Sequence, residues 1–201
     1  MPNIEKTSPK AWLRAAKKAL ILEGHSGVKI DHIAKTLGVT RGGFYHNFKS
    51  RTELMDRLLE DWATSNELVP EMANVDSPER AMAWLDGITM HMIAEKDYSP
   101  AFEMAIREWA RVDRKVMRVV DRVDAKRIGR LTRLFSALGC DADEAPIRAR
   151  VLYFHQIGYY SLGYHKRQTK VERFRNSPIY LRILGGRHYV DQESRRAKTR
   201  D

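Results

Sequence analysis

Apolar residues at helical spacing near the N-terminus constrain the fold more than any other feature of the sequence. The first set recurs at three- and four-residue intervals: Trp12, Ala16, Ala19 and Leu20. This spacing places them on one face of an amphipathic helix. Ser8 can cap that helix, Pro9 suits its first position, and Gly24 can end it. One amphipathic helix is therefore expected between Ser8 and Gly24.

A second, shorter helical pattern follows the glycine-containing turn after Gly24. Its apolar positions fall at i, i+3, i+4 and i+7, namely Ile30, Ile33, Ala34 and Leu37. Gly38 comes next, and glycine is the residue best able to take the left-handed conformation that ends a helix. We therefore expect a tight turn at Gly38, leading directly into another short helix.

The third helix is expected to begin after Thr40, which would cap it. Phe44 and Phe48 lie four residues apart, so they would be buried together on its inner side. Two short helices joined by a tight turn, with a third helix ahead of them and a basic outer surface, form the helix-turn-helix arrangement. In that arrangement the last helix enters the major groove of DNA.

The outward positions of this last helix are candidates for contact with DNA. They are Arg41, Gly42, Tyr45 and His46, with Thr40 at the positively polarised N-terminus. Arginine can bond guanine O6 and N7 together, a threonine methyl can meet the thymine methyl, and a tyrosine hydroxyl suits a phosphate oxygen. Gly42 and Gly43 each cost a helix roughly 1 kcal/mol relative to alanine. We infer a close backbone approach to DNA at Gly42 and close packing on the neighbouring helix at Gly43.

A fourth helix is expected to begin at Ser50. Ser50 and Glu53 have the spacing of a capping box, in which two side chains satisfy the first N–H groups of a helix. The remaining N–H groups, beside Lys49 and Arg51, would form a phosphate clamp.

Charge and composition narrow the class of protein. The formal net charge is +10, and residues 1–52 hold most of it, with ten Lys and Arg against three Asp and Glu. A polyanionic partner is therefore favoured.

The single cysteine, Cys140, excludes an internal disulfide framework. No apolar run approaches the ~20 residues of a membrane span. With no secretory segment after Met1, a cytoplasmic location without membrane partners is expected.

The segment "IDHIAKTLGVTRGGFYHNFKSRTELMDRLLEDW" resembles the DNA-binding segment of the TetR family of bacterial transcriptional repressors. Its most specific parts are "IAKTLGVTRGGFYHNF" and the "KSRTEL" that follows. The resemblance implies that Thr40 to His46 face the major groove and that Tyr45 and Arg51 hold phosphates. The family usually has serine or threonine where this chain has Lys29. The second helix therefore loses its expected side-chain cap, and Lys29 could instead reach a phosphate.

The rest of the chain also has helical patterns. Leu54, Leu58 and Trp62 continue the fourth helix, and the next helix is expected to begin at Ser77-Pro78. Ser99-Pro100 begins another through Trp109, and Asp113 begins a long one ending at Gly139. The predicted fold class is all-α, with a helix-turn-helix domain at residues 1–52 and a larger helical domain at residues 53–186. The fourth helix, from about residue 51, would link them, and residues 187–201 would form a polar tail.

The resemblance implies that the second domain binds a small molecule and forms a homodimer through two helices. Candidates for these helices are "EAPIRARVLYFHQIGYYSLGYHKR" and the segment from Val171 to Leu184. Ile147, Val151, Phe154, Ile157 and Gly158 share one stripe of the first. An intramolecular core would produce the same stripe, so the pattern leaves both readings open.

An effector pocket is expected among the middle helices, because aromatic residues and methionine form adaptable apolar walls. The candidates are Trp84, Met92, Phe102, Met104, Trp109, Met117 and Tyr153. Plain core packing is the alternative for each of them. His91, His155 and His165 form no paired cluster at metal-ligand spacing, so we expect no metal and no cofactor beyond the effector.

The function expected from the sequence is a ligand-responsive dimeric repressor that releases a palindromic double-stranded DNA operator. A helical interaction scaffold that binds DNA without sequence preference is the first alternative. An enzyme is the second, because Asp97, Glu103, Glu108 and His155 could in principle share a cleft. Their spacing gives it no support, since Glu103 and Glu108 lie on diverging helical faces and no nucleophile motif is present.

Overall fold

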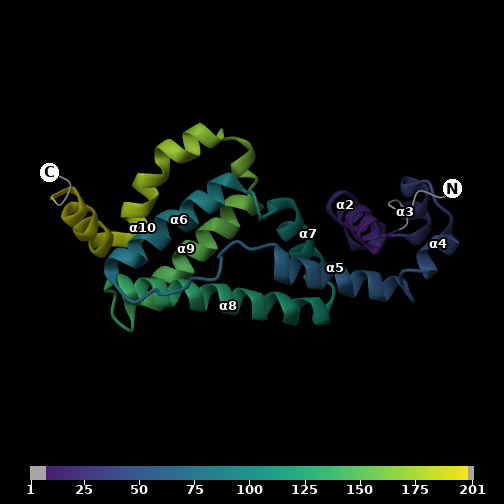
Figure 1. Ribbon diagram of the computed structural model, residues 1–201, viewed down its shortest axis with the longest axis horizontal. Coiled ribbons are helices and arrows are strands. Elements are labelled where there is room, and N and C mark those ends of the chain that lie inside the picture. The colour runs from purple at the N-terminus through teal and green to yellow at the C-terminus, as the bar shows by residue number, and fades with distance from the viewer. Residues whose placement is uncertain (1–7, 199–201) are drawn as a thin grey trace. The chain divides into compact units, whose positions relative to one another are not determined.

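The computed structural model describes residues 8–198, with side chains up to residue 194, and every regular element in that range is a helix (Figure 1). The predicted all-α fold with an N-terminal helix-turn-helix is confirmed. The elements are α2 (Pro9–Gly27), α3 (Ile30–Leu37), α4 (Arg41–Tyr45), α5 (Arg51–Ser65), α6 (Pro78–Ala94), α7 (Pro100–Ala110), α8 (Arg114–Leu138), α9 (Glu144–Ser161), the 3-10 helix η1 (Tyr164–Lys166) and α10 (Lys170–Lys198). Among the described residues, no helix is both long and apolar enough to cross a membrane.

The chain divides into two compact units, and neither is continuous in sequence. The first contains the chain up to Asn66 together with Ser99–Asp121, and the second contains Glu67–Tyr98 and the chain from Arg122 onward. The long helix α8 contributes to both units. The domain bounds drawn from the sequence remain a prediction, because compactness alone does not define a domain that folds by itself.

Serine caps explain why several helices begin where the sequence predicts. The hydroxyls of Ser8, Ser77 and Ser99 each accept a hydrogen bond from the N–H three residues later, and a proline occupies the following position in each case. This pairing satisfies a helix N–H that otherwise has no partner, and the proline replaces another one. The predicted starts of α2, α6 and α7 are therefore confirmed.

The first unit packs around buried aromatic rings. Trp12 of α2 is fully buried, and its ring lies edge-on to Phe44 of α4 with 5.3 Å between ring centroids. Phe48 stacks on Phe44 at 5.4 Å, so the predicted burial of these two phenylalanines is confirmed. In the same unit, Glu103 of α7 is completely buried and accepts hydrogen bonds from Trp62 at 2.9 Å and from Arg107 at 2.9 Å.

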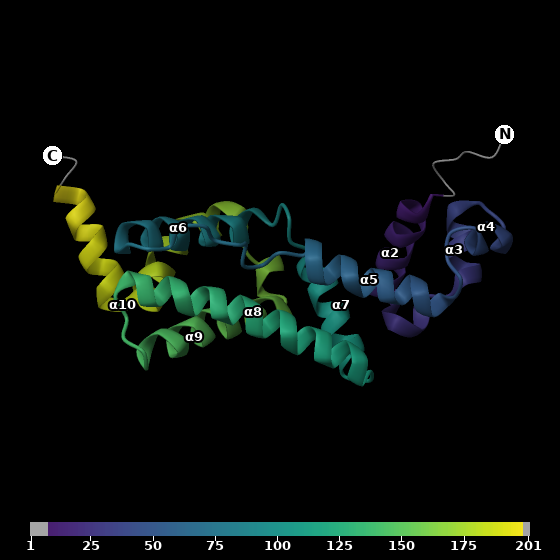
Figure 2. The same ribbon diagram turned by 60° about the horizontal axis from the view of Figure 1, so that its bottom comes forward.

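In the second unit α10 packs against both α6 and α9, and the second half of α8 lies alongside (Figure 2). Buried Arg130 of α8 fixes the irregular segment between α5 and α6. Its guanidinium donates to the Val69 carbonyl at 2.5 Å and to Glu67 at 2.9 Å, and it also pairs with Glu71. The ion pair with Arg130 lowers the pKa of the Glu71 carboxyl, so that carboxyl stays ionised near neutral pH.

Two helices are broken by kinks at glycines. The first helix breaks at Gly24 as predicted, because that residue takes φ 72° and ψ −177°, but helical structure resumes after this kink and α2 ends at Gly27. Similarly, α10 continues to Lys198 and so includes most of the predicted polar tail, with a kink at Gly186. The last residues of that tail, 199–201, lie outside the described residues.

Candidate nucleic-acid interface and ligand cavity

The turn between α3 and α4 has the geometry predicted for Gly38. This residue adopts the left-handed conformation at φ 67° and ψ 37°. Its N–H donates to the Lys35 carbonyl at 3.1 Å, and the next N–H, of Val39, donates to the Ala34 carbonyl at 3.0 Å. These bonds satisfy the last carbonyls of α3 and reverse the chain within a few residues. The short helix α4 is thereby fixed directly against α3 and α2.

Every residue predicted to contact DNA is exposed in the first unit: Lys29, Thr40, Arg41, Gly42, Tyr45, His46, Lys49 and Arg51. Arg41 donates to the Tyr45 hydroxyl at 3.2 Å, and its guanidinium also lies 3.7 Å from Asp31. The bond to Tyr45 raises the pKa of Arg41, which is therefore positively charged at any physiological pH. The first turn of α4 thus presents an oriented cation and an aromatic ring to solvent.

Two expected local contacts of α4 are wrong. Thr40 occupies the N-cap position with extended backbone, but its side chain makes no capping hydrogen bond. A Cβ added to Gly43 would meet no atom within 4 Å, so no neighbouring helix packs closely against this glycine. The predicted loss of a cap at α3 is confirmed, since Lys29 occupies that N-cap without a side-chain hydrogen bond.

The start of α5 is capped by Ser50 and Glu53 as predicted, and Arg51 makes additional contacts. The Glu53 N–H donates to the Ser50 hydroxyl at 3.1 Å, and the Glu53 carboxylate accepts from the backbone N–H of Lys49 at 2.7 Å. Arg51 donates from Nε to the Val28 carbonyl at 2.6 Å and from its terminal nitrogen to the His25 carbonyl at 2.5 Å. Arg51 therefore ties α5 to the connection between α2 and α3, a role that the sequence did not indicate.

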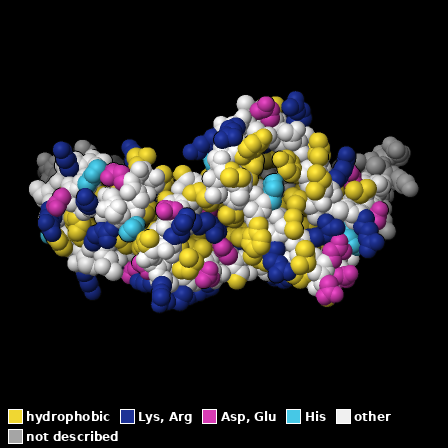
Figure 3. All heavy atoms as spheres, turned by 180° about the vertical axis from the view of Figure 1, so that it is seen from behind, with side chains coloured by type: hydrophobic (Ala, Val, Ile, Leu, Met, Phe, Trp, Pro, Cys, Tyr) yellow, Lys and Arg dark blue, Asp and Glu magenta, His cyan; other side chains and the backbone are white. Residues whose placement is uncertain are grey.

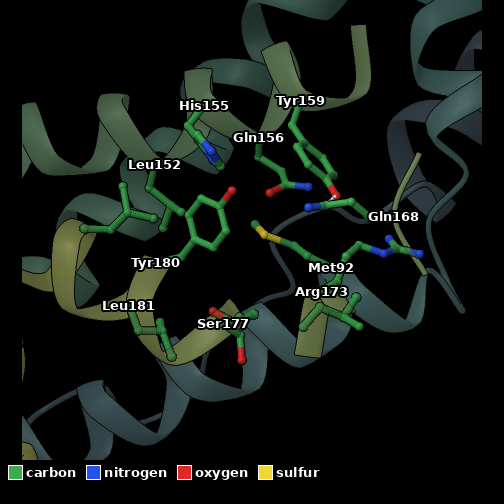
Figure 4. Close-up of a pocket in the computed structure, with 13 residues that line it drawn as sticks. Met92, Leu152, His155, Gln156, Tyr159, Gln168, Arg173, Ser177, Tyr180 and Leu181 are labelled. Atoms are coloured by element: carbon green, nitrogen blue, oxygen red, sulfur yellow. Dashed lines mark hydrogen bonds between the residues drawn. The ribbon is translucent and has the colours of Figure 1, made fainter. Parts of the chain in front are cut away.

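A cavity of about 70 Å³ lies within the second unit, between α6, α9 and α10 (Figure 4). Its wall is apolar at Met92, Leu152 and Leu181, and the Tyr180 ring projects into the same space. The polar residues that line it are Thr89, His155, Gln156, Gln168, Arg173 and Ser177. Burial lowers the pKa of His155, so its imidazole is neutral near neutral pH.

Arg173 is the cationic residue of the cavity lining. One terminal nitrogen donates to Glu95 at 2.6 Å, while its buried Nε has no hydrogen-bond partner among the described residues. Tyr159 is held in place because its hydroxyl donates to Gln168 at 2.6 Å. A mostly apolar wall with a few fixed polar groups is typical of a small-molecule site.

The residues predicted to form a pocket do not come together in this cavity. Met92 lines it, whereas buried Tyr153 uses its hydroxyl to donate to Asp124 at 2.7 Å. Trp84 donates from its indole to the Ala73 carbonyl at 3.1 Å. The other candidates belong to the first unit: Phe102, Met104, Trp109 and Met117. Much of the cavity lining comes from residues of α9 at three- and four-residue spacing. The apolar stripe next to them on the same helix made this pattern hard to recognise in the sequence.

The predicted apolar stripe of α9 is exposed on the single chain. Ile147, Val151 and Phe154 are 51%, 52% and 59% exposed, and Val171, Phe174 and Ile183 of α10 are 77%, 58% and 68% exposed. Figure 3 shows hydrophobic side chains gathered on the surface of the lobe that α10 forms. An intramolecular core does not account for this stripe, because these side chains are not buried within the described part of the chain.

The three histidines considered for metal binding make different contacts. His91 contacts the Glu67 carbonyl at 2.5 Å, His155 lines the cavity, and His165 packs against the Tyr160 ring at 5.2 Å. A group with metal-binding atoms close together does occur elsewhere in the described residues, formed by Cys140, Glu144 and His188.

Comparison with known proteins gives one family match and a shared fold. Residues 13–58, from α2 to α5, match the family described as bacterial regulatory proteins, tetR family. A transcriptional regulator from Rhodococcus sp. Rha1 has a similar structure, with a TM-score of 0.52 and 16% identity over 90% of this chain and 93% of that chain. BioQ, solved with its natural double-stranded DNA operator, has a TM-score of 0.49 and 16% identity over 90% of this chain and 98% of that chain. A search of curated protein sequences gave no match.

Proposed function

We propose that this chain, in which residues 13–58 match the tetR family of bacterial regulatory proteins, is a dimeric repressor that a small molecule releases from a palindromic operator. One observation carries the DNA-binding part of this proposal. The left-handed turn at Gly38 fixes α4 against α3 and leaves Arg41, Tyr45 and His46 exposed together on its outer side. Such a helix, with a cation and hydrogen-bond donors on its free face, fits the major groove.

The exposed apolar faces of α9 and α10 support the homodimer. Leaving several large side chains in water is unfavourable by about 25 cal/mol per Å² of apolar surface, so a second copy that covers both faces would stabilise the pair. Gly158 of α9 has no atom within 4 Å of an added Cβ, which leaves room for a close helix approach. A two-fold dimer would also match the two half-sites of a palindromic operator, about 34 Å apart.

The cavity of the second unit supports the effector part of the proposal. Its apolar lining favours a small hydrophobic molecule, and the buried Nε–H of Arg173 favours a carbonyl or carboxylate on that molecule. The volume of about 70 Å³ holds only a few heavy atoms, so a larger effector has to displace Tyr180 or Met92. Release of DNA then requires that the effector bind the two conformational states with unequal affinity.

The DNA-binding part is tested by fluorescence anisotropy with two duplexes of equal length, one from the intergenic region upstream of the gene itself and one scrambled. Each is titrated at two salt concentrations. We expect tighter binding to the upstream duplex that persists at higher salt, with two subunits per site. Equal and strongly salt-sensitive binding to both duplexes would instead favour the scaffold that binds DNA without sequence preference.

The effector part is tested with fragments that combine a small apolar ring and a carboxylate. We expect binders to release the operator from the wild type but not from a Leu152→Phe variant, whose larger side chain fills the cavity. The variant has to retain operator affinity for this comparison to be valid. Release that is equal in both proteins would place the effector site elsewhere.

A further inference from the structure

A cluster of metal-binding side chains lies in the second unit, apart from the cavity lining. Cys140, Glu144 and His188 each offer one ligand atom, and these atoms lie within 4.8 Å of one another. Nε2 of His188 is 3.4 Å from Oε2 of Glu144. Ligands bound tetrahedrally to zinc at 2.0–2.3 Å are roughly 3.3–3.8 Å apart. The imidazole and the carboxylate therefore already have the separation of two zinc ligands.

Three separate parts of the fold bring these residues together. Gly139, at φ 113°, ends α8 and turns the chain so that the N–H of Cys140 donates to the Phe135 carbonyl at 3.0 Å. Glu144 begins α9 directly after this turn. His188 follows the kink at Gly186, where φ is 59°. His188 thus lies beside the α8–α9 turn that holds Gly139 and Cys140.

The cluster is sheltered and its histidine is incompletely satisfied. Cys140 is 6% exposed. Nε2 of His188 is shielded from solvent but forms no well-aligned hydrogen bond within the described part of the chain. A Cβ on Gly139 would lie 3.1 Å from the other ring nitrogen, Nδ1, so Nε2 is the nitrogen that faces Glu144. A buried ring nitrogen without a good partner is unfavourable unless something else binds it.

Arg148 leaves one oxygen of Glu144 available for a cation. Its Nε donates to Oε1 of Glu144 at 2.7 Å, and a terminal nitrogen donates to the Leu184 carbonyl at 2.7 Å. Oε2, the other carboxylate oxygen, is the one that faces His188. Partners that orient a ligating carboxylate in this way are common around protein metal sites.

We propose that Cys140, Glu144 and His188 bind one divalent cation of the zinc class, with water at the fourth position. A thiolate, an imidazole and a carboxylate together suit zinc and cobalt better than magnesium or calcium, which prefer oxygen ligands alone. Coordination releases the Cys140 thiol proton to solvent, because the thiolate is the metal ligand. The two anionic ligands balance the charge of a divalent cation. This site is independent of the proposed DNA-binding function.

The test uses the purified full-length chain, freed of metal and titrated with Co²⁺ and then with Zn²⁺. Because Cys140 is the only cysteine, a sulfur-to-cobalt charge-transfer band can arise from this residue alone. We expect such a band at one Co²⁺ per chain, displacement of Co²⁺ by Zn²⁺, and a higher unfolding temperature with Zn²⁺ bound.

Three variants and one control identify the ligands. Cys140→Ser should abolish the band, and His188→Gln or Glu144→Gln should weaken Co²⁺ binding by more than about 100-fold, since outer-shell partners alone contribute 10–100-fold. His32→Gln is the control, because exposed His32 lies 3.6 Å from Glu23 but has no thiol nearby. Circular dichroism checks that each variant is folded. No thiolate band in the wild type, or a band of undiminished affinity in His188→Gln and Glu144→Gln, would overturn the proposal.

Discussion

Arg41 and Tyr45 are coupled residues on the outer face of α4. The Arg41 guanidinium donates to the Tyr45 hydroxyl at 3.2 Å and lies 5.9 Å from the centroid of its ring. The spacing of four residues in a helix makes this contact possible. In the proposed DNA interface Tyr45 would therefore act in two ways: it would contact a phosphate directly, and it would orient the arginine that is proposed to read a base.

This coupling leads to a prediction about DNA affinity. Arg41→Ala should reduce discrimination at one base pair by about 1–3 kcal/mol, whereas Tyr45→Phe should weaken binding to all duplexes. Because the two side chains interact, their effects on operator affinity should not add in the double variant. Anisotropy titrations of the single and double variants measure the coupling, with Arg41→Ala combined with Lys49→Ala as the additive control. Additivity within about 0.5 kcal/mol for both pairs would contradict the coupling.

Glu103 is a buried structural carboxylate rather than a free acid-base group. Its side chain is completely buried, and it accepts hydrogen bonds from Trp62 and Asn66 and pairs with Arg107 at 2.8 Å. The sequence left open whether Glu103 and Glu108 could serve an enzyme. The contacts of Glu103 account for its burial without any catalytic role.

Removal of the Glu103 carboxylate should strongly destabilise the fold. We expect Glu103→Ala to lower the free energy of unfolding by about 3–5 kcal/mol, because Arg107 and the Trp62 indole lose their partner in a buried site. Urea unfolding followed by circular dichroism measures this change. Glu108→Ala is the matched control from the same helix. Glu108 is 73% exposed, and its ion pair with Arg111 at 3.9 Å is a weak surface contact, so the free energy of unfolding should change by no more than about 0.5 kcal/mol. Similar effects of the two substitutions would refute the structural role of Glu103.

At the scale of elements, α4 is short and contains two glycines whose roles differ. Gly43 has open space around an added Cβ, and the Cβ of an alanine at Gly42 would meet only the Thr40 hydroxyl at 3.6 Å. The protein itself therefore does not require glycine at either position. Gly42 lies among the exposed residues that are expected to face DNA, so the requirement there would come from the duplex.

The two glycines should respond alike in stability and differently in DNA binding. Gly42→Ala and Gly43→Ala should each raise the free energy of unfolding by about 0.5–1 kcal/mol, because alanine favours the helix. Gly42→Ala should also weaken operator binding if the DNA backbone approaches closely, while Gly43→Ala should not. Urea unfolding and anisotropy measure the two effects. Unchanged operator affinity in Gly42→Ala would disprove the close approach.

The sequence predicts the helices well where a local signal specifies them. Ser8, Ser77 and Ser99, each followed by proline, mark helix starts that depend on neighbouring residues alone. Gly38 likewise marks a turn through its own conformational freedom. The helical residues between the kink at Gly24 and Gly27 were not predicted, because a glycine in the left-handed region usually marks the end of a helix.

The sites are less predictable because they depend on contacts between distant parts of the chain. The cavity combines residues of α6, α9 and α10, and no periodicity within one helix reports that arrangement. The second role of Arg51, at the carbonyls of His25 and Val28, is equally a tertiary contact. Exposed residues of α4 were predictable because a single helix face contains them all.

For the whole molecule, the exposed stripes of α9 and α10 determine the expected oligomeric state. Phe154 and Ile183 are 59% and 68% exposed, and they belong to stripes that are apolar along much of both helices. A soluble monomer rarely exposes so extended an apolar surface. A homodimer would also make operator affinity depend on protein concentration, since both half-sites have to be occupied together.

Charges placed in these stripes should therefore separate the subunits without unfolding them. We expect Phe154→Glu and Ile183→Glu each to convert the dimer into a monomer, measured by light scattering after size exclusion. Operator affinity should fall by at least about 10-fold, because burying an unpaired carboxylate in an interface costs more than about 1.4 kcal/mol. Leu22→Glu is the control: Leu22 is 69% exposed on α2, outside the stripes, and its replacement should leave the dimer intact. If both stripe variants remained dimeric with full operator affinity, the subunits would have to associate through a different surface. The exposed apolar faces of α9 and α10 would then need another partner.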